Sequence, residues 1–330
     1  MEKETVATIA LVFIAVTAAS TLSGNKTVNR PNVVLITLEA TEASKLVCYS
    51  YHRNTTPNLC DLAESSTVYT NAYTASTYTP LAISSISTGR YPFEIGMYTG
   101  DSVLRQRFST LAERLSSAGY VTYGLHAGNP QLLPPEKGIL QGFERFSANG
   151  SSIAHLLESS DRPVFVREHI NGPHYPYRTG EAYEPRYIDT LKENWLELVE
   201  RSSDREPVNR TVERYIEAAY DDNLRATDIH EIGPMLERLR ESPEFNNTFV
   251  IVTADHGHTE LGSYGPLEHR HRQLHVPLII HYPGKEQGRD SSLVSTIDIM
   301  PTVLDAAGLD YSRETVRMST SSPPTYPTGR

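Results

Sequence analysis

The stretch Phe249-Val-Ile-Val-Thr-Ala-Asp255-His256-Gly257-His258 contains the feature around which the rest of the chain is organised. It begins with apolar and β-branched residues, a run typical of a strand buried on both faces. It then breaks into Asp255-His256, and a carboxylate beside an imidazole is costly to bury unpaired. Both side chains are suitable metal ligands, and Gly257 allows the chain to turn away after them. This stretch alone leaves two interpretations open, a metal-binding pair and a hydrogen-bonded Asp-His pair at a strand end.

Composition limits the possible partners. The chain has 330 residues, a net charge of −10 at pH 7 and a pI near 5.7. A chain of this length can bury a large core, as one α/β domain or as two smaller ones. The acidic balance argues against nucleic acid as a partner and identifies no other ligand.

The N-terminal segment indicates export. Residues 5–21 carry no charge and are mostly apolar, slightly fewer than the ~20 residues that a spanning helix needs. A secretory signal peptide and an uncleaved membrane anchor both fit. We therefore expect a signal or anchor with its linker in residues 1–30, a globular domain in 31–310 and a disordered tail, rich in Ser, Thr and Pro, in 311–330. The expected location is extracellular or at the cell surface, secreted or membrane-anchored.

Sequons and cysteines agree with that location. Five Asn-X-Ser/Thr sequons predict a glycoprotein; they begin at Asn25, Asn54, Asn149, Asn209 and Asn246. The only two cysteines, Cys48 and Cys60, could form a disulfide outside the cell or could be small buried apolar residues.

Strand-like and helix-like segments alternate along the chain. Strands are expected at 32–38, 68–73, 120–125, 164–169, 249–254 and 275–281, and the main helices near 57–63, 80–88, 111–118, 215–239 and 301–307. This alternation predicts an α/β fold with a mostly parallel central sheet and helices on both faces. In such sheets, ligands bind at the carboxyl ends of the strands. Polar residues fall at or just beyond these ends: Glu39, His126, His174, Asp255 and His256. Because several strands end in such residues at one edge of the sheet, a metal site is favoured over a simple hydrogen-bonded Asp255-His256 pair.

A threonine begins one of the helices. Thr79 precedes Pro80, and the helix ends before Gly89, so Thr79 is expected at the N-cap. Its hydroxyl would lie at the positive end of the helix dipole, where sulfate and phosphate bind readily. An ordinary threonine cap is the alternative interpretation.

Several motifs together resemble the sulfatase branch of the alkaline-phosphatase superfamily over about residues 31–309. They are Asn32-Val-Val-Leu-Ile-Thr-Leu-Glu39, Tyr51-x-Arg-x-Thr-Thr-Pro-Asn-Leu59, Thr88-Gly-Arg-Tyr-Pro92, Pro173-His174-x-Pro-Tyr177, Thr253-Ala-Asp-His-Gly257, Val276-Pro-Leu-Ile-Ile280 and Asp298-x-x-Pro-Thr302. The resemblance implies the alkaline-phosphatase/sulfatase-like form of the α/β fold. Their order and spacing are much more specific for the fold than for the substrate.

The chain departs from this pattern at the nucleophile. Ordinary sulfatases have a Cys or Ser that is converted to formylglycine, whereas Thr79 cannot be converted by that route. Leu81 and Ile83 replace the Pro and Arg of the sulfatase signature, and Glu39-Ala40 replaces a pair of aspartates. A Glu, a Thr nucleophile and an Asp-His pair are similar to the set used by the phosphoethanolamine and phosphoglycerol transferases of the superfamily.

The resemblance implies roles for named residues. Thr79 is the expected nucleophile, and the expected metal ligands are Glu39, Thr79, Asp255 and His256. This mixture of oxygen and nitrogen ligands suits Mn²⁺ or Zn²⁺ better than Ca²⁺. His174 is expected to bind the substrate and assist catalysis.

Further histidines compete for contacts to the substrate or leaving group. His126 is a substrate-binding candidate, and His271 is favoured over His258 and His269 for the additional position after the Asp-His-Gly motif. The resemblance leaves this choice open, because the motif does not fix the spacing to that position.

Three functions fit. The first is a metal-dependent hydrolase of sulfate or phosphate esters that acts on a small-molecule, lipid or glycan substrate. The second is a transferase of a phospho-headgroup onto a lipid or surface glycan. The third is a degenerate binding protein. The replaced signature residues Leu81 and Ile83 favour it, whereas the intact set of Glu39, Thr79, Asp255 and His256 opposes it.

Overall fold

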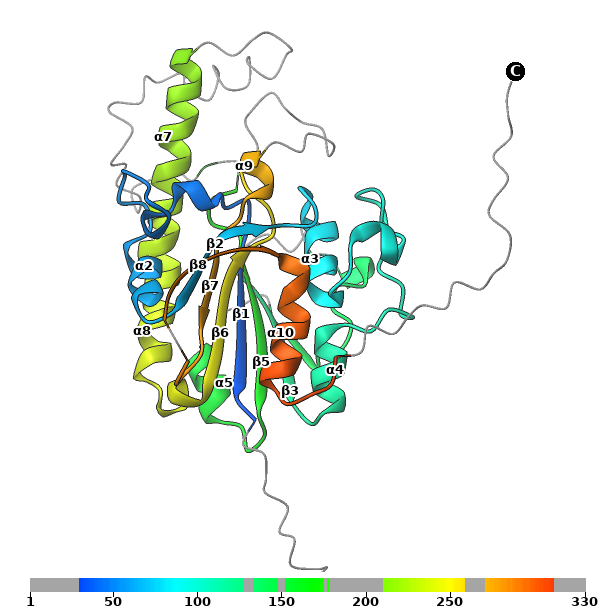
Figure 1. The fold of residues 1–330 in the computed structure, drawn as a ribbon. Helices are drawn as coiled ribbons and strands as arrows, with labels where there is room; N and C mark the ends of the chain where they lie inside the picture. The colour runs from blue at the N-terminus through cyan, green and yellow to red at the C-terminus, as the bar shows by residue number, and fades with distance from the viewer. Residues whose placement is uncertain are drawn as a thin grey trace, which may run out of the picture.

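The computed structural model describes residues 30–127, 133, 135–147, 152–174, 177, 210–258, 271–285 and 287–311. They form an eight-stranded sheet with the strand order β4-β3-β5-β1-β6-β7-β2-β8 (Figure 1). The strands are β1 (Asn32–Leu38), β2 (Thr67–Tyr73), β3 (Val121–Ala127), β4 (Arg145–Ser147), β5 (Val164–Ile170), β6 (Thr248–Ala254), β7 (Leu278–His281) and β8 (Gly288–Ser295).

The sheet is mostly parallel, as the sequence predicts. At its centre, β1 pairs in parallel with β5 on one side and β6 on the other. Among the described strands only β7 runs antiparallel to the rest, between β6 and β2. The carboxyl ends of the central strands therefore meet along one edge, the upper edge in Figure 1.

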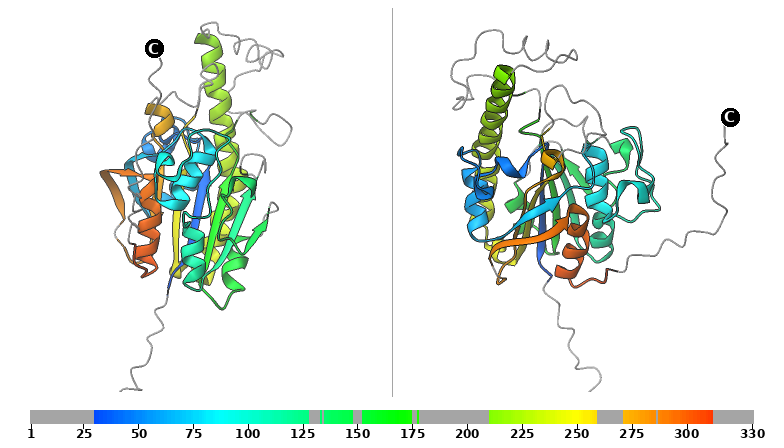
Figure 2. Two further views of the ribbon diagram at one scale, coloured as in Figure 1. Left: turned by 90° about the vertical axis from the view of Figure 1, so that its right-hand side faces the viewer. Right: turned by 45° about the horizontal axis from the view of Figure 1, so that its top comes forward.

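Helices cover both faces of the sheet (Figure 2). They are α2 (Pro57–Glu64), α3 (Thr79–Thr88), α4 (Leu111–Ser117), α5 (Ile153–Glu158), α7 (Arg210–Thr227), α8 (Gly233–Glu241), α9 (His271–Leu274) and α10 (Ile299–Ala306). Alternate residues of β1 belong to different cores, because successive strand side chains point to opposite faces. Val33 and Leu35 pack in the core with α3, α4 and α10, whereas Val34 and Ile36 pack with α2, α5, α7 and α8.

The helix expected over 215–239 is interrupted. Asp228–Ile232 forms a π-helical turn between α7 and α8. Pro234 lies two residues after this turn, and proline lacks the N–H group that a regular α-helix would use there. The buried Asp228 carboxylate accepts hydrogen bonds of 2.9 Å from the backbone N–H groups of both Asn58 and Leu59. A residue far away in the chain thus satisfies the free N–H groups at the start of α2.

Four of the labelled helices and strands are not predicted from the sequence: β4, α5, α9 and β8. The β8 side chains are mostly exposed or half-buried on the last strand of the sheet, so no apolar run marks them. The strand expected over 275–281 begins only at Leu278, because Pro277 just before it has no N–H group for the ladder.

The structure shows whether the two cysteines pair and how exposed two of the sequon asparagines are. Cys48 and Cys60 form a disulfide. The sequon asparagines Asn54 and Asn246 are both exposed. The predicted signal or anchor and the tail beyond Tyr311 lie outside the described residues, and no described helix is long and apolar enough to cross a membrane.

Candidate active site

Two carboxylates lie side by side where β1 and β6 end. The ladder continues one residue past each strand: Glu39 N donates to Ile170 O at 2.9 Å, and Asp255 N donates to Leu38 O at 3.1 Å. Both carboxylate side chains are fully buried. Because Glu39 and Leu35 are an even number of residues apart, the alternation of β1 also directs Glu39 toward the face covered by α3.

Thr79 completes this cluster from α3. The helix begins at Thr79 with Tyr78 as its N-cap, so the expectation that Thr79 itself is the N-cap is wrong by one residue. The cause is that the carbonyl of Tyr78 accepts the first helical hydrogen bonds, from Leu81 and Ala82. Thr79 Oγ1 donates to Glu39 Oε1 at 2.7 Å and lies 3.3 Å from His256 Nε2.

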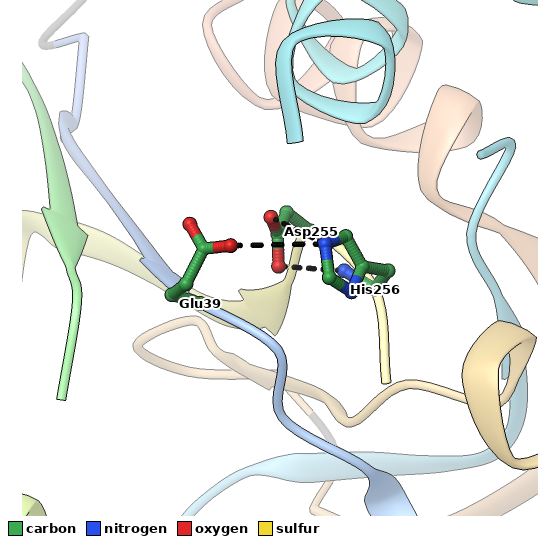
Figure 3. A group of neighbouring side chains, drawn as sticks. All are labelled: Glu39, Asp255 and His256. Carbon is green, nitrogen blue, oxygen red and sulfur yellow. Dashed lines mark hydrogen bonds and ion pairs between the residues drawn. The ribbon is translucent and has the colours of Figure 1, made fainter. Parts of the chain in front are cut away.

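The orientation of the His256 ring is fixed by the backbone. Its Nδ1 lies 2.8 Å from the carbonyl oxygen of Gly257, which can only accept, so Nδ1 carries the hydrogen. In the neutral ring Nε2 is then a free ligand atom. It lies 3.4 Å from Asp255 Oδ2 and 3.7 Å from Glu39 Oε1, so all three side chains converge (Figure 3).

Gly257 is required because another segment packs directly against it. Its N–H donates to Gln273 O at 2.7 Å, and a Cβ at this position would lie 2.0 Å from the carbonyl oxygen of Arg272. The close packing of Gly257 against Arg272 and Gln273 fixes the backbone next to His256.

Gly257→Ala is expected to lower the free energy of unfolding by about 2 kcal/mol or more, because backbone must move to admit the methyl group. Denaturant unfolding measures this effect. Gly119→Ala is the control: nothing lies within 4 Å of its Cβ position and its φ is +94°, so only backbone strain of about 1 kcal/mol is expected. Equal losses in the two variants would contradict the packing argument.

The electrostatics of the two carboxylates differ. Burial raises the pKa of Glu39, but the hydrogen bond from His169 and the charges of His169 and His256 outweigh it, lowering the pKa to about 2. Burial and the negative charge of Glu39 raise the pKa of Asp255 to about 6. Two negative charges share a small buried volume, an arrangement that a bound cation stabilises.

The residues present fit a metal ion. Glu39, Asp255 and His256 each offer one ligand atom, and these atoms all lie within 4.8 Å of one another. Asp255 Oδ1 accepts from the N–H groups of Ala40 (2.9 Å) and His256 (2.7 Å), whereas Oδ2 is buried with no hydrogen-bond partner among the described residues. A buried carboxylate oxygen without a donor is an acceptor that a cation satisfies. Two oxygens and one imidazole nitrogen are a common ligand set for divalent metals.

His169 is a site residue that sequence reasoning missed. Its Nε2 donates to Glu39 Oε2 at 2.7 Å, and its Nδ1 lies 2.8 Å from Thr37 Oγ1. The three side chains are fully buried, and the strand register places His169 opposite Thr37. His169 therefore positions Glu39 from the side away from Thr79. The only sequence signal for His169 was a histidine near the end of a buried strand. Its contact with Glu39 could not be predicted, because the pairing register was unknown.

We expect His169→Ala to lower kcat/KM by about 10- to 100-fold and to weaken metal binding, because Glu39 loses the group that orients it. His169→Gln, which retains an N–H donor, should lose less of both. Steady-state kinetics and a metal titration on each variant measure the two effects. If metal affinity were unaltered in His169→Ala, the positioning role would be excluded.

Two of the expected substrate-binding histidines lie at the same edge of the sheet. His126 is buried at the end of β3, and its ring stacks on that of His169 with centroids 5.5 Å apart. His174 lies on the loop after β5 and is half-buried. Contact of either histidine with a substrate stays a prediction.

The later histidines occupy different surroundings. His258 is buried, its Nε2 lies 2.7 Å from Tyr177 Oη, and burial and the charge of Arg272 lower its pKa to about 3. His271 is exposed at the start of α9, with its Nε2 3.0 Å from Tyr73 Oη. Its described ring contacts are with Tyr73 and His275, not with the metal cluster. His269 lies outside the described residues.

The family model for sulfatases matches residues 31–155 and 146–309. The chain belongs to the sulfatase family. This sulfatase-family chain carries Thr79 where the resemblance expects a formylglycine precursor, so its family membership does not by itself establish its chemistry.

Curated relatives agree with the family. The chain is 31% identical over 162 residues to an endo-4-O-sulfatase of Bacteroides thetaiotaomicron, covering 47% of this chain and 31% of the relative. It is 23% identical over 290 residues to an ulvan-active sulfatase of Formosa agariphila, covering 84% and 54%. For human arylsulfatase A the identity is 24% over 378 residues, covering 91% and 68%. The chain spans about a third to two thirds of the length of the first curated relatives that it matches.

Solved structures confirm the fold. A phosphonate monoester hydrolase of Agrobacterium radiobacter matches with a TM-score of 0.68 and 19% identity, over 85% of this chain and 74% of the other. A protein of the alkaline phosphatase superfamily from Vibrio parahaemolyticus matches with a TM-score of 0.57 and 20% identity, over 86% and 67%. The sequence prediction of an alkaline-phosphatase/sulfatase-like sheet is therefore confirmed.

Proposed function

We propose that the chain is a metal-dependent hydrolase of sulfate esters that uses Thr79 as its nucleophile. The observation that carries the proposal is the buried convergence of Thr79 Oγ1 with Glu39 Oε1 (2.7 Å) and His256 Nε2 (3.3 Å) at the start of α3. A hydroxyl with only a structural role would not need a buried carboxylate and an imidazole beside it. The relatives named as sulfatases support the choice of a sulfate ester.

Glu39, Asp255 and His256 would hold the metal, and Thr79 would be a further ligand. A bound divalent cation supplies Lewis-acid stabilisation of negative charge and favours the deprotonated form of a hydroxyl beside it. The mixed oxygen and nitrogen set favours Mn²⁺ or Zn²⁺ over Ca²⁺, which prefers oxygen ligands alone.

The chain's own groups account for the rest of the reaction. The Thr79 proton leaves along the hydrogen bond to Glu39, Oγ1 bonds to sulfur, and the bond from sulfur to the ester oxygen breaks. Thr79 lies at the N-terminus of α3, where the positive end of the helix dipole would stabilise the charge on the sulfuryl oxygens. His174 would hold those oxygens or protonate the departing oxygen. Water then cleaves the bond between Thr79 and sulfur, releasing sulfate and restoring the hydroxyl.

A phosphate ester or a transfer reaction is the second candidate. The observation that favours it is the combination of Glu39 and Thr79 in place of paired aspartates and a Cys or Ser. An acceptor alcohol of a lipid or glycan would replace water in the second step. A degenerate binding protein remains the third possibility, because Leu81 and Ile83 replace two signature residues.

We also propose that the protein is exported and glycosylated, secreted or held at the cell surface by its N-terminal segment. The Cys48–Cys60 disulfide is typical of proteins that fold outside the cytosol. The exposed sequon residues Asn54 and Asn246 are accessible for a glycan.

The decisive assay uses the purified protein with Mn²⁺ or Zn²⁺ on an aryl sulfate, an aryl phosphate monoester and an aryl phosphodiester, each with a Thr79→Ala control. We expect the aryl sulfate to be hydrolysed by the wild type only. Turnover of a phosphate substrate alone would favour the second candidate. Absence of any Thr79-dependent turnover, together with absence of bound metal, would leave the binding protein.

A further inference from the structure

We infer that four exposed aromatic side chains beside Thr79 form a platform on which the sugar rings of a glycan substrate stack. They are Tyr78, Tyr91, Phe93 and Tyr98, and they are called the aromatic platform below. Their exposed fractions are 39%, 39%, 64% and 72%. Since these are four of the seven exposed large apolar side chains among the described residues, their gathering within 21 positions indicates a binding surface. The inference rests on the proposed function only for the statement that the glycan carries a sulfate ester; binding of the glycan does not depend on it.

The aromatic platform begins at the nucleophile. Tyr78 directly precedes Thr79, and Gly100 lies against its ring so closely that a Cβ on Gly100 would be 2.6 Å from Tyr78 Oη. Tyr98 is two residues from Gly100, and its hydroxyl donates to Phe93 O at 3.4 Å. The segment that carries Phe93 and Tyr98 therefore returns, at Gly100, to the Tyr78 ring beside the reactive hydroxyl.

The outer part of the platform is a stacked pair. The rings of Tyr91 and Phe93 are nearly parallel, with an angle of 9° and centroids 5.7 Å apart. Such a pair presents two rings in a defined orientation instead of two independent side chains.

A separate small core connects the segment that carries Phe93 and Tyr98 to α3. It consists of Leu81, Ile95, Met97, Leu104 and Phe108, which form an apolar cluster distinct from the two main cores. Leu81 belongs to the first turn of α3, so this cluster fastens the segment carrying Phe93 and Tyr98 to the helix that begins with Thr79. The segment lies beside α3 in Figure 1, in cyan. The backbone that carries these rings is therefore fixed to α3, which lowers the cost of ordering it on binding.

The chemistry of the platform fits a carbohydrate. The apolar C–H faces of sugar rings pack on aromatic faces, and the hydroxyl groups of three tyrosines can bond to sugar hydroxyls. A glycan whose ester lies at Thr79 would extend outward over Tyr78 toward Tyr98.

Binding is tested first, in the Thr79→Ala protein, with a panel of sulfated hexasaccharides of galactan, fucan and glycosaminoglycan type. Isothermal titration should show that adding Tyr98→Ala or Phe93→Ala weakens the Kd of the bound hexasaccharide by about ten-fold. Leu293→Ala is the matched control, because Leu293 is 79% exposed on β8 and lies outside the platform. It should leave the Kd unchanged.

Kinetics separate this inference from the proposed function. In the protein that retains Thr79, Tyr98→Ala should lower the ratio of kcat/KM on the hexasaccharide to that on an aryl sulfate by about ten-fold, through KM. Hexasaccharide binding without turnover would overturn the hydrolase and support the platform. Aryl sulfate turnover with no hexasaccharide bound, or with an unchanged Kd in Tyr98→Ala, would overturn the platform. The third outcome is co-sedimentation of the protein with phosphatidylcholine vesicles. If Tyr98→Ala abolished that co-sedimentation and left the hexasaccharide Kd unchanged, the glycan platform would be overturned in favour of a lipid-binding surface.

Discussion

Replacing Thr79 with alanine is expected to lower kcat by about a thousand-fold or more without unfolding the protein, because the attacking oxygen is removed. The side chain accounts for little of the packing, since its hydroxyl bonds to Glu39 and His256 and not to the core. Thr79→Ser should retain activity within about ten-fold of the wild type, since it keeps the oxygen and loses only a methyl group. Initial rates on the substrate found in the aryl ester assay measure both variants.

The matched control for Thr79→Ala is on the same helix. Thr88 is also buried, and its hydroxyl donates to Ser84 O at 2.8 Å within α3. Thr88→Ala therefore removes a buried threonine hydroxyl from the same helix without touching the cluster. We expect nearly full activity. Equal losses in the two variants would mean that α3 requires its hydroxyls for structure, and Thr79 would lose its catalytic assignment.

Replacing Asp255 with asparagine is expected to lower metal affinity by at least about 100-fold and to abolish metal-stimulated activity, since even residues that only orient ligands contribute 10- to 100-fold. The asparagine can still accept the hydrogen bonds from Ala40 N and His256 N through its oxygen. Its NH₂ group would replace Oδ2, which lies 3.4 Å from His256 Nε2. The fold should therefore persist while the ligand atom is lost. Metal content and a titration with Mn²⁺ and Zn²⁺ test this.

Asp228→Asn is the control for removing a buried carboxylate. Asp228 accepts backbone hydrogen bonds at the start of α2, away from the metal cluster. Asp228→Asn should lower the free energy of unfolding and leave metal affinity unchanged. Unchanged metal affinity in Asp255→Asn would contradict the assignment of Glu39, Asp255 and His256 as a metal site.

Much of the fold could be predicted from local sequence patterns. The run before Asp255 and the run before Glu39 are both buried on two faces, and the structure pairs them directly. The strand-end rule predicted that Glu39 and Asp255 lie at the same edge of the sheet, and the family resemblance added Thr79 to them. In contrast, β8 is polar because it lies on the edge of the sheet, so hydrophobic periodicity could not reveal it.

Features of the site that depend on pairing register could not be predicted. His169 contacts Glu39 only because β5 pairs with β1 so that His169 lies opposite Thr37. Ala40 adopts a left-handed conformation with φ of 47°, and Asp255 Oδ1 accepts from its N–H. Alanine gives no sequence signal for this conformation, which glycine or asparagine would indicate. The sequence also could not decide whether the two cysteines pair, because only the fold brings Cys60 of α2 beside Cys48.

The central claim is that Thr79 becomes covalently attached to the transferred group, and acid quenching during turnover tests it most directly. The quenched protein is digested, and its peptides are analysed by mass spectrometry. We predict one sulfuryl group, or one phosphoryl group if the second candidate holds, on the peptide containing Thr79, and none in Thr79→Ala. A modified peptide that contains another hydroxyl, or turnover that persists in Thr79→Ala, would contradict the claim.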